Sequence, residues 1–306
     1  MPPRSGETVG EHRFTAFGVR LALRTHGDRI DVFGSDQHAI EFPPGWQDDE
    51  PVAAAATLTY DLAVVSPSRS RRQYELRNGA EIVAAGNDLP PLLGAFTAHA
   101  ELLIAQHAPE HLFVHAGAVA WQGMGVVMPG HSLSGKTSLV RAFLEAGATY
   151  YSDEYAVMDR RGYVHPYTRP LAIRGLPGRA AMRVPPRALG ASIGRIAVPV
   201  GLILVTTHRP GAKWRPRRVA RSRAAIALMA HAIAARGDPR HSMPILAATV
   251  RSALALAGSR GEAAALVRQF TARFGAPEAH PTAEWLALPG GDWSADRRIA
   301  SKGSRA

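Results

Sequence analysis

The most constraining feature of the sequence is the stretch PGHSLSGKTSLV, which spans residues 129–140. It contains Gly130, four further residues, and then Gly135, Lys136 and Thr137. A short apolar run, VVM, precedes it, and apolar residues recur at helical spacing after it. These are Leu139, Val140, Phe143 and Leu144. The sequence therefore predicts a strand, a glycine-rich loop (residues 130–137) and a helix in succession, which is typical of an α/β fold.

The glycine-rich loop has the composition of a phosphate-binding loop. Backbone N–H groups of such a turn converge on phosphate oxygens, and the start of the next helix adds partial positive charge. Lys136 would then reach the β- and γ-phosphates of ATP, and the Thr137 hydroxyl would contact Mg²⁺. The bare pattern arises by chance in on the order of one per cent of chains of this length, and Lys136 would then simply be solvated. The predicted nucleotide-contacting residues are Gly130, His131, Ser132, Leu133, Ser134, Gly135, Lys136, Thr137 and Ser138.

Two adjacent carboxylates, Asp153 and Glu154, follow the next predicted strand, ATYYS. At that end of a strand they face the same edge of the sheet as the glycine-rich loop. One carboxylate of such a pair can hold Mg²⁺ while the other accepts a proton from an incoming hydroxyl. The alternative is an ordinary exposed loop pair. Asp159 is a weaker candidate for a metal ligand, because hairpin ends are often acidic.

The composition and charge of the chain limit the classes of protein to which it can belong. The chain has 306 residues, of which 46% are hydrophobic, enough for a sizeable core in one large or two ordinary domains. It has no cysteine, which excludes disulfides and thiolate metal sites. The N-terminus lacks the apolar stretch of a secretory signal, and the longest apolar run, IAVPVGLILV, is too short to span a bilayer. We expect a cytoplasmic protein without a membrane segment.

The formal net charge of +11 favours acidic partners or reflects an Arg- and Ala-rich composition. The positive residues concentrate in HRPGAKWRPRRVARSR (residues 208–223) and after Gly290. Arg215, Arg217 and Arg218 would dock an acidic acceptor, and Trp214 would stack on a base or on nothing. The alternative is a solvated basic loop. Nucleic-acid binding is not favoured, because no recognition helix or RNA-binding signature accompanies the segment.

Two domains and a C-terminal tail are predicted along the chain. Residues 1–90 form a β-rich N-terminal domain, with a hairpin at Asn78-Gly79 and a loop over EFPPGWQDDEP. Residues 91–290 form the second domain, with a core over 111–275, beginning with a helix over 91–107. Two strands joined at residues 123–125 precede the glycine-rich loop, and an apolar helix follows the basic segment over AAIALMAHAIAA. Residues 291–306 form a flexible basic tail.

Three stretches resemble the C-terminal catalytic domain of HPr kinase/phosphorylase. FVHAGAVAWQGMGVVMPG is similar to that family's strand hairpin, with His115 at its histidine position. GHSLSGKTSLVRAFLEAGATYYSDE resembles its phosphate loop, helix and acidic pair. RPLAIRGLPG resembles its Ile-Arg-Gly-Leu signature and includes Arg174. The resemblance covers residues 111–180, and more loosely extends to 275.

The resemblance implies a phosphate-loop kinase fold related to phosphoenolpyruvate carboxykinase, and γ-phosphoryl transfer to a serine hydroxyl. It implies a proton-shuttling or phosphate-contacting role for His115, and a phosphate-binding or orienting role for Arg174. A core or edge histidine and a surface strand end are the respective alternatives. His107, His111 and His115 are spaced by four residues, but Pro109 interrupts a continuous helix, so we reject a zinc site.

The sequence departs from this family at identifiable positions. Ser138 stands where the family usually has a glutamate, and PGRAAMRVPP does not follow its continuation after the signature. These departures point away from HPr as the acceptor. Divergent kinases with this domain occur as tailoring enzymes for ribosomally made peptides, including lasso peptides, and a β-rich N-terminal half is similar to those.

Together these features favour an ATP- and Mg²⁺-dependent serine kinase acting on a peptide or small protein. Asp153 would take the hydroxyl proton, Lys136 would neutralise charge, and Thr137 and Glu154 would hold the metal, with Asp153 as a further ligand candidate. Two alternatives stay open: a nucleotide-binding regulatory or scaffold module that does not transfer phosphate, and a small-molecule kinase. The sequence also leaves a homo-oligomer open.

Overall fold

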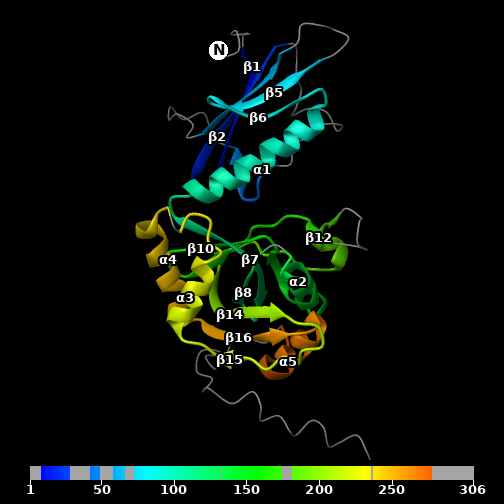
Figure 1. The fold of residues 1–306 in the computed structure, drawn as a ribbon, viewed down its shortest axis with the longest axis vertical. Helices are drawn as coiled ribbons and strands as arrows, with labels where there is room; N and C mark the ends of the chain where they lie inside the picture. The colour runs from blue at the N-terminus through cyan, green and yellow to red at the C-terminus, as the bar shows by residue number, and fades with distance from the viewer. Residues whose placement is uncertain are drawn as a thin grey trace, which may run out of the picture. The chain divides into compact units, whose positions relative to one another are not determined.

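The computed structural model describes residues 8–27, 42–48, 58–65, 72–131, 133–173, 181–235 and 237–277. The chain divides into two compact units, Met1–Glu110 and His111–Ala306. It is a mixed α/β protein with strands and helices in both units (Figure 1). The predicted boundary at residues 90/91 lies twenty residues earlier than the observed one, because the first helix packs on the sheet of unit 1.

Unit 1 is built on a six-stranded sheet in the order β3-β1-β2-β4-β5-β6. The strands are β1 (Thr8–Ala16), β2 (Val19–His26), β3 (Trp46–Asp48), β4 (Leu58–Val64), β5 (Tyr74–Asn78) and β6 (Glu81–Gly86). β2 and β4 pair in parallel, and the other neighbours pair antiparallel. The predicted hairpin at Asn78-Gly79 is present, with Gly79 at a φ of 58°. Part of the predicted loop over EFPPGWQDDEP instead forms β3, which pairs with β1.

Helix α1 (Leu89–His107) covers part of this sheet. Prolines at its first positions fit there because those N–H groups have no helical partner. Phe96 is fully buried and packs edge-on against Phe14 and Tyr60 of the sheet. The helix predicted over residues 91–107 is thus present, but its apolar face supports unit 1.

Unit 2 contains an eight-stranded sheet in the order β11-β10-β7-β8-β14-β16-β15, with β9 pairing β7 and β11 also pairing β14. Its strands are β7 (His111–Trp121), β8 (Met124–Pro129), β9 (Thr149–Ser152), β10 (Tyr155–Asp159), β11 (Tyr163–His165), β14 (Val198–His208), β15 (Arg217–Arg218) and β16 (Leu254–Arg260). β14 is parallel to both β8 and β16. A separate pair consists of β12 (Leu171–Ile173) and β13 (Met182–Val184), followed by the short 3₁₀ helix η1 (Pro186–Leu189).

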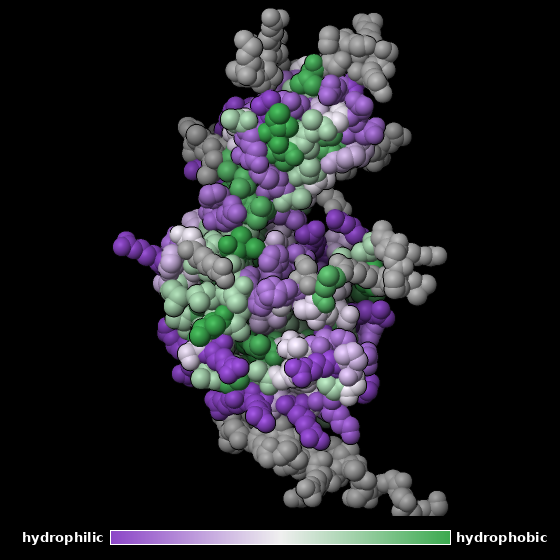
Figure 2. All heavy atoms as spheres, in the orientation of Figure 1, coloured by the Kyte–Doolittle hydropathy of each residue, from purple (hydrophilic) through white to green (hydrophobic). Residues whose placement is uncertain are grey.

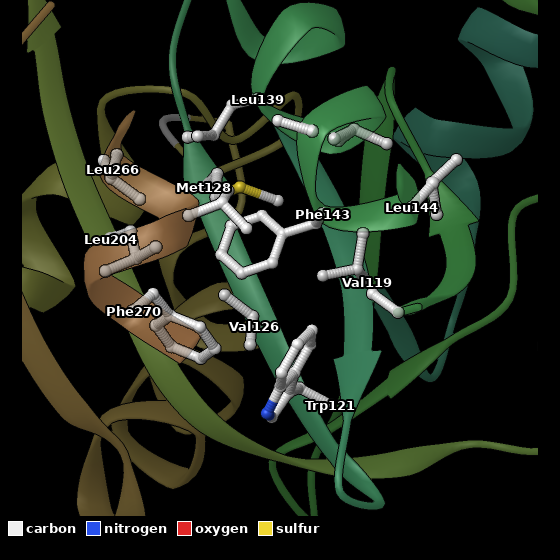
Figure 3. Packing of buried hydrophobic residues seen from close by; sticks show 14 of the residues in the cluster. Val119, Trp121, Val126, Met128, Leu139, Phe143, Leu144, Leu204, Leu266 and Phe270 are labelled. Carbon is white, nitrogen blue, oxygen red and sulfur yellow. The ribbon is translucent and has the colours of Figure 1, made fainter. Parts of the chain in front are cut away.

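Helices cover both faces of this sheet (Figure 1). They are α2 (Lys136–Glu145), α3 (Arg221–Met229), α4 (Pro239–Ser252) and α5 (Ala263–Phe274). On one face, Phe143 of α2 lies against Val126 of β8 and Phe270 of α5 (Figure 3). On the other face, α3 and α4 pack on alternate strand residues such as Val127. The two apolar faces explain why the central strands are continuously hydrophobic.

The segment after α3 departs from the helix predicted over AAIALMAHAIAA. α3 ends at Met229, and residues 231–233 then bond to the backbone of β7. The His231 carbonyl accepts from the His115 N–H at 2.8 Å, and the Ile233 N–H donates to the Phe113 carbonyl at 2.9 Å. β8 pairs with β7 only as far as Ala116↔Pro129. The segment therefore continues along β7 from the point where the chain leaves β8, and these sheet bonds replace those of a longer helix.

Across the described residues, no helix combines the length and hydrophobicity needed to cross a bilayer. The predicted basic tail, residues 291–306, lies outside the described residues.

Candidate functional site

The glycine-rich loop connects β8 to α2, as the sequence predicts. Leu133 and Gly135 take positive φ angles of 70° and 83°, and the Ser134 N–H donates to the His131 carbonyl at 3.1 Å. A Cβ at Gly130 would lie 2.5 Å from the Ser134 hydroxyl oxygen, so the Ser134 side chain would have to move to admit one. The loop thus turns tightly into the N-terminus of α2, where the first N–H groups have no partner within the helix. Ser132 lies outside the described residues.

The Lys136 side chain folds back over the loop. Its ammonium donates to the carbonyls of Gly130 and His131, both at 2.8 Å. Burial lowers the pKa of Lys136, while the nearby Glu154 and Asp153 act in the opposite direction. The positive charge therefore lies at the mouth of the loop, between two carbonyls and the acidic pair.

Asp153 follows β9 and is bonded to the start of α2. The Thr137 hydroxyl donates to Asp153 Oδ2 at 2.9 Å, and the Tyr150 hydroxyl lies 3.1 Å from Asp153 Oδ1. Only 6% of Asp153 is exposed. Burial raises the pKa of Asp153, although the bonds from Thr137 and Tyr150 oppose that rise. The carboxylate is thus held in place and is more basic than an ordinary aspartate.

Glu154 faces a different partner. Its Oε1 lies 3.5 Å from Nδ1 of His115 on β7, and both side chains are about one third exposed (40% and 34%). The interaction with His115 lowers the pKa of Glu154, with burial acting against it. The structure therefore separates the acidic pair: Asp153 points to Thr137, whereas Glu154 points to His115.

A cavity of about 580 Å³ opens beside these groups. The glycine-rich loop and the exposed side of α2 form one wall, while β12 and the first residues of α5 form others. The lining residues are Leu133, Gly135, Lys136, Thr137, Ser138, Arg141, Ala142, Glu145, Asp153, Glu154, Ala172, Ile173, Ala181, Glu262, Ala263 and Ala264. The volume lies within the range of small-molecule and cofactor sites.

The cavity mixes charges and apolar surface in a way that suits a nucleotide. Positive charge in the cavity comes from Lys136 and the start of α2. Apolar surface in its lining comes from Ala172 and Ile173 of β12. Thr137 and the acidic pair supply only oxygen donors, which hard cations such as Mg²⁺ prefer. The described residues hold no cluster of three or more His, Asp or Glu side chains that would bind a metal without help from a ligand. A cation here would take its remaining ligands from water or from a bound ligand.

Some predicted residues lie elsewhere. Asp159 is at the far end of β10, where its carboxylate accepts from the N–H groups of Arg161 and Tyr163 and contacts His165. It therefore braces the turn into β11. Arg174 lies outside the described residues.

The basic segment does not line the cavity. Arg215, Arg217 and Arg218 are exposed, and the last two form β15 at the sheet edge. Trp214 is 6% exposed and belongs to the apolar core, so stacking on a base is excluded for it in this conformation. Figure 2 shows that the drawn face of unit 2 mixes hydrophilic and hydrophobic residues, with hydrophobic residues on the side of α3, where Ile226 is 61% exposed.

Three residues of the site were missed by the sequence analysis. Tyr150 contacts Asp153 from within β9, and the His231 ring lies 4.2 Å from that of His131, between centroids. Burial lowers the pKa of His231, and the neighbouring His131, Lys136 and His115 act in the same direction. Arg260 bonds the carbonyls of the loop from beneath. His231 and Arg260 approach the loop only through the tertiary fold, so no local pattern could have identified them.

Comparison with known proteins does not assign the chain to a family: no family model matches it, and no curated protein matches it significantly. Any function must therefore be argued from the site.

Proposed function

We propose that the chain is an ATP-dependent kinase that transfers the γ-phosphoryl group to a serine hydroxyl of a peptide or small protein. The observation that carries this proposal is the convergence of Lys136, Thr137 and the acidic pair on one cavity, with Thr137 and Asp153 joined at 2.9 Å. A loop lysine and a helix N-terminus favour a polyphosphate, and adjacent oxygen donors favour the cation that accompanies it. The resemblance to the HPr kinase/phosphorylase catalytic domain supports the same proposal and suggests the finer fold class.

In this proposal the triphosphate lies over the glycine-rich loop. Lys136 exchanges its bonds to the Gly130 and His131 carbonyls for bonds to β- and γ-phosphate oxygens, and the N–H groups at the start of α2 hold the adjacent oxygens. The base and ribose occupy the wider part of the cavity. Mg²⁺ would neutralise charge on the phosphates, held by Thr137 and Asp153.

Transfer then needs an acceptor beside the γ-phosphate. The serine oxygen forms a bond to the γ-phosphorus, the bond to the β,γ-bridging oxygen breaks, and ADP leaves. The hydroxyl proton passes to a carboxylate of the acidic pair. In this proposal the position of Glu154 favours it for this step, since its side chain is more exposed than that of Asp153 and lies beside His115, and this accessibility outweighs its lowered pKa.

This division of roles differs from the sequence-based one, in which Asp153 is the base and Glu154 a metal ligand. Two variants distinguish them: Asp153→Asn and Glu154→Gln. We expect Asp153→Asn to raise the Mg²⁺ concentration for half-maximal rate by about tenfold or more. We expect Glu154→Gln to lower kcat by about 100-fold or more and leave the Mg²⁺ requirement unchanged. Loss of kcat in Asp153→Asn without a change in Mg²⁺ requirement would restore the sequence-based assignment.

The proposal itself is tested by binding and transfer together. Calorimetric titration with ATP and Mg²⁺ measures binding, and a pooled serine-peptide library with ATP labelled in the γ-phosphate measures transfer. Absence of binding at millimolar ATP refutes the proposal. Binding without transfer to peptides or to water would instead support one of the two alternatives, a nucleotide-binding regulatory module or a small-molecule kinase.

A further inference from the structure

Arg260 is a buried cation directly beneath the glycine-rich loop. It is the last residue of β16 and is 2% exposed. One terminal nitrogen, Nη2, donates to the carbonyls of Ser134 and Gly135 at 3.3 and 3.0 Å, and the other, Nη1, donates to the Gly261 carbonyl at 3.0 Å. The side chain thus joins the loop to Gly261, two residues before α5, and the first residues of α5 form another wall of the cavity.

Burial of this guanidinium is costly. No salt bridge to a carboxylate is formed by Arg260 within the described part of the chain, and its Nε is buried without a hydrogen-bond partner. A buried cation whose contacts are backbone carbonyls contributes less to stability than a well-packed apolar residue of similar size would. Stability alone therefore does not account for an arginine at this position, and its contacts with the loop indicate a role in what the loop does.

The explanation follows from the geometry of the peptide bond. In a trans peptide the C=O and N–H groups point in opposite directions, and the described residues include no cis peptide. The Ser134 carbonyl shares its peptide with the Gly135 N–H, and the Gly135 carbonyl shares its peptide with the Lys136 N–H. Arg260 holds the Ser134 carbonyl, and together with the Leu139 N–H it holds the Gly135 carbonyl, so the two N–H groups point away from Arg260. Gly135 and Lys136 both line the cavity, so the N–H groups are placed for phosphate oxygens.

The glycine at position 135 makes this close contact possible. Its φ of 83° favours glycine, and a Cβ there would lie 2.5 Å from Arg260 Nη2. The guanidinium can approach the loop this closely only because position 135 has no side chain.

We propose that Arg260 is a positioning residue that keeps the glycine-rich loop in its polyphosphate-binding conformation. This inference rests on the proposed function. It predicts that Arg260 sets the affinity for the phosphate part of the nucleotide and leaves recognition of the nucleoside part unaffected.

The test compares ligands that share the nucleoside or the phosphates. Arg260→Met removes the donors, Arg260→Lys keeps the charge but loses the planar fork, and Arg209→Met is the control, since Arg209 is exposed and does not line the cavity. Calorimetry would measure binding of MgATP, magnesium pyrophosphate and adenosine to each variant. We expect Arg260→Met to weaken MgATP and pyrophosphate binding by about tenfold or more, with adenosine binding within twofold of wild type. The affinity of Arg260→Lys for MgATP and pyrophosphate should lie between those of Arg260→Met and the wild type. The affinities of Arg209→Met should match those of the wild type.

Three results would overturn the proposal. Unchanged pyrophosphate affinity in Arg260→Met means that the side chain does not position the loop. Equal loss of adenosine and pyrophosphate affinity means that the cavity has collapsed and the role is structural. If circular dichroism shows that Arg260→Met is unfolded, Arg260→Lys decides, and full pyrophosphate affinity in that variant refutes the role. A wild-type protein that binds neither ATP nor pyrophosphate refutes the proposed function itself, which the wild-type titration reveals before any variant is made.

Discussion

Tyr150→Phe tests the hydrogen-bond network around Asp153. The Tyr150 hydroxyl has one proton but two acceptors in reach, Asp153 Oδ1 at 3.1 Å and the Arg169 carbonyl at 2.9 Å. While Asp153 is ionised, the Tyr150 hydroxyl should donate to the Asp153 carboxylate, because charge-assisted hydrogen bonds are stronger than neutral ones. Once Asp153 is protonated, it can donate to the tyrosine oxygen, and the hydroxyl can then donate to Arg169. The network therefore changes its direction as Asp153 titrates.

The loss of stability in Tyr150→Phe should differ between the ionised and the protonated form of Asp153. Phenylalanine keeps the shape of this fully buried ring, so the lost hydroxyl accounts for most of the effect. A hydrogen bond to a charged acceptor contributes about 1.5–3 kcal/mol, and one between neutral groups about 1 kcal/mol. Burial already raises the pKa of Asp153, and removal of the tyrosine donor should raise it further. Tyr150→Phe should therefore destabilise the protein by about 2 kcal/mol at pH 8, or roughly 4–8 °C in the Tm of a unit of this size.

The sign of the pH dependence is fixed by the raised pKa. The pKa of Asp153 in the unfolded chain is near 3.8. Below that pH the carboxyl group is protonated in both the folded and the unfolded state, and its favourable contribution to folding is fully present. That contribution is lost as pH rises through the folded pKa, and more is lost in the variant. The destabilisation should thus grow from about 1 kcal/mol near pH 4 to its full value at pH 8.

Urea unfolding followed by circular dichroism between pH 4 and 8 measures this, and ¹³C NMR of the carboxyl group reports the pKa of Asp153 directly. Tyr151→Phe is the matched control, since the neighbouring Tyr151 is also buried but its hydroxyl donates to the Ile196 carbonyl at 2.7 Å. The control should lose about 1 kcal/mol at every pH. A Tyr150→Phe effect that is independent of pH, or an Asp153 pKa that stays the same or falls, would refute the reasoning.

Three further predictions concern other parts of the molecule. Lys136→Ala should weaken MgATP binding by about ten- to hundredfold in calorimetry, because the ammonium would bond the phosphates; equal affinity would exclude a phosphate at the loop. Asp159→Asn should cost about 2 kcal/mol at pH 7 in urea unfolding, because hydrogen bonds outweigh burial and lower the Asp159 pKa. The loss of stability in Asp159→Asn should shrink as pH falls below 3.8 through the pKa of Asp159 in the folded state. A loss that stays constant with pH would argue against a stabilising role for the ionised carboxylate. Arg217→Ala with Arg218→Ala should leave ATP affinity within twofold, since neither side chain lines the cavity; if they dock an acidic acceptor, its KM should rise, less so at high salt.

Local patterns in the sequence were sufficient for much of the fold. The Asn78-Gly79 turn predicted the hairpin of β5 and β6 in unit 1, and helical spacing predicted α1 and α2. The junction of β8, the glycine-rich loop and α2 follows directly from the loop motif. The acidic pair was placed correctly beside the loop, because a strand that ends near it must deliver the next residues to the same edge.

Features that depend on pairing between distant segments were not predictable in this way. Apolar residues over 224–235 have helical spacing, yet residues 231–233 leave the helix because β7 offers free backbone groups beyond Ala116. The same event brings His231 to His131. Similarly, Trp214 lies within a run of cations, which concealed that its ring packs into the core. In each case tertiary contacts outweigh the local preference.

The bonds between Arg260 and the glycine-rich loop also affect when the loop can take its final form. They join residues that are 126 and 125 positions apart in the chain. During synthesis at 5–20 residues per second, the ribosome needs roughly 6–25 s to proceed from the loop to Arg260. Throughout that interval the nascent loop lacks its guanidinium brace and the parallel pairing of β14 with β16. Under the proposed function, a nucleotide would therefore bind at the end of folding, as a ligand that stabilises the finished unit and does not nucleate it.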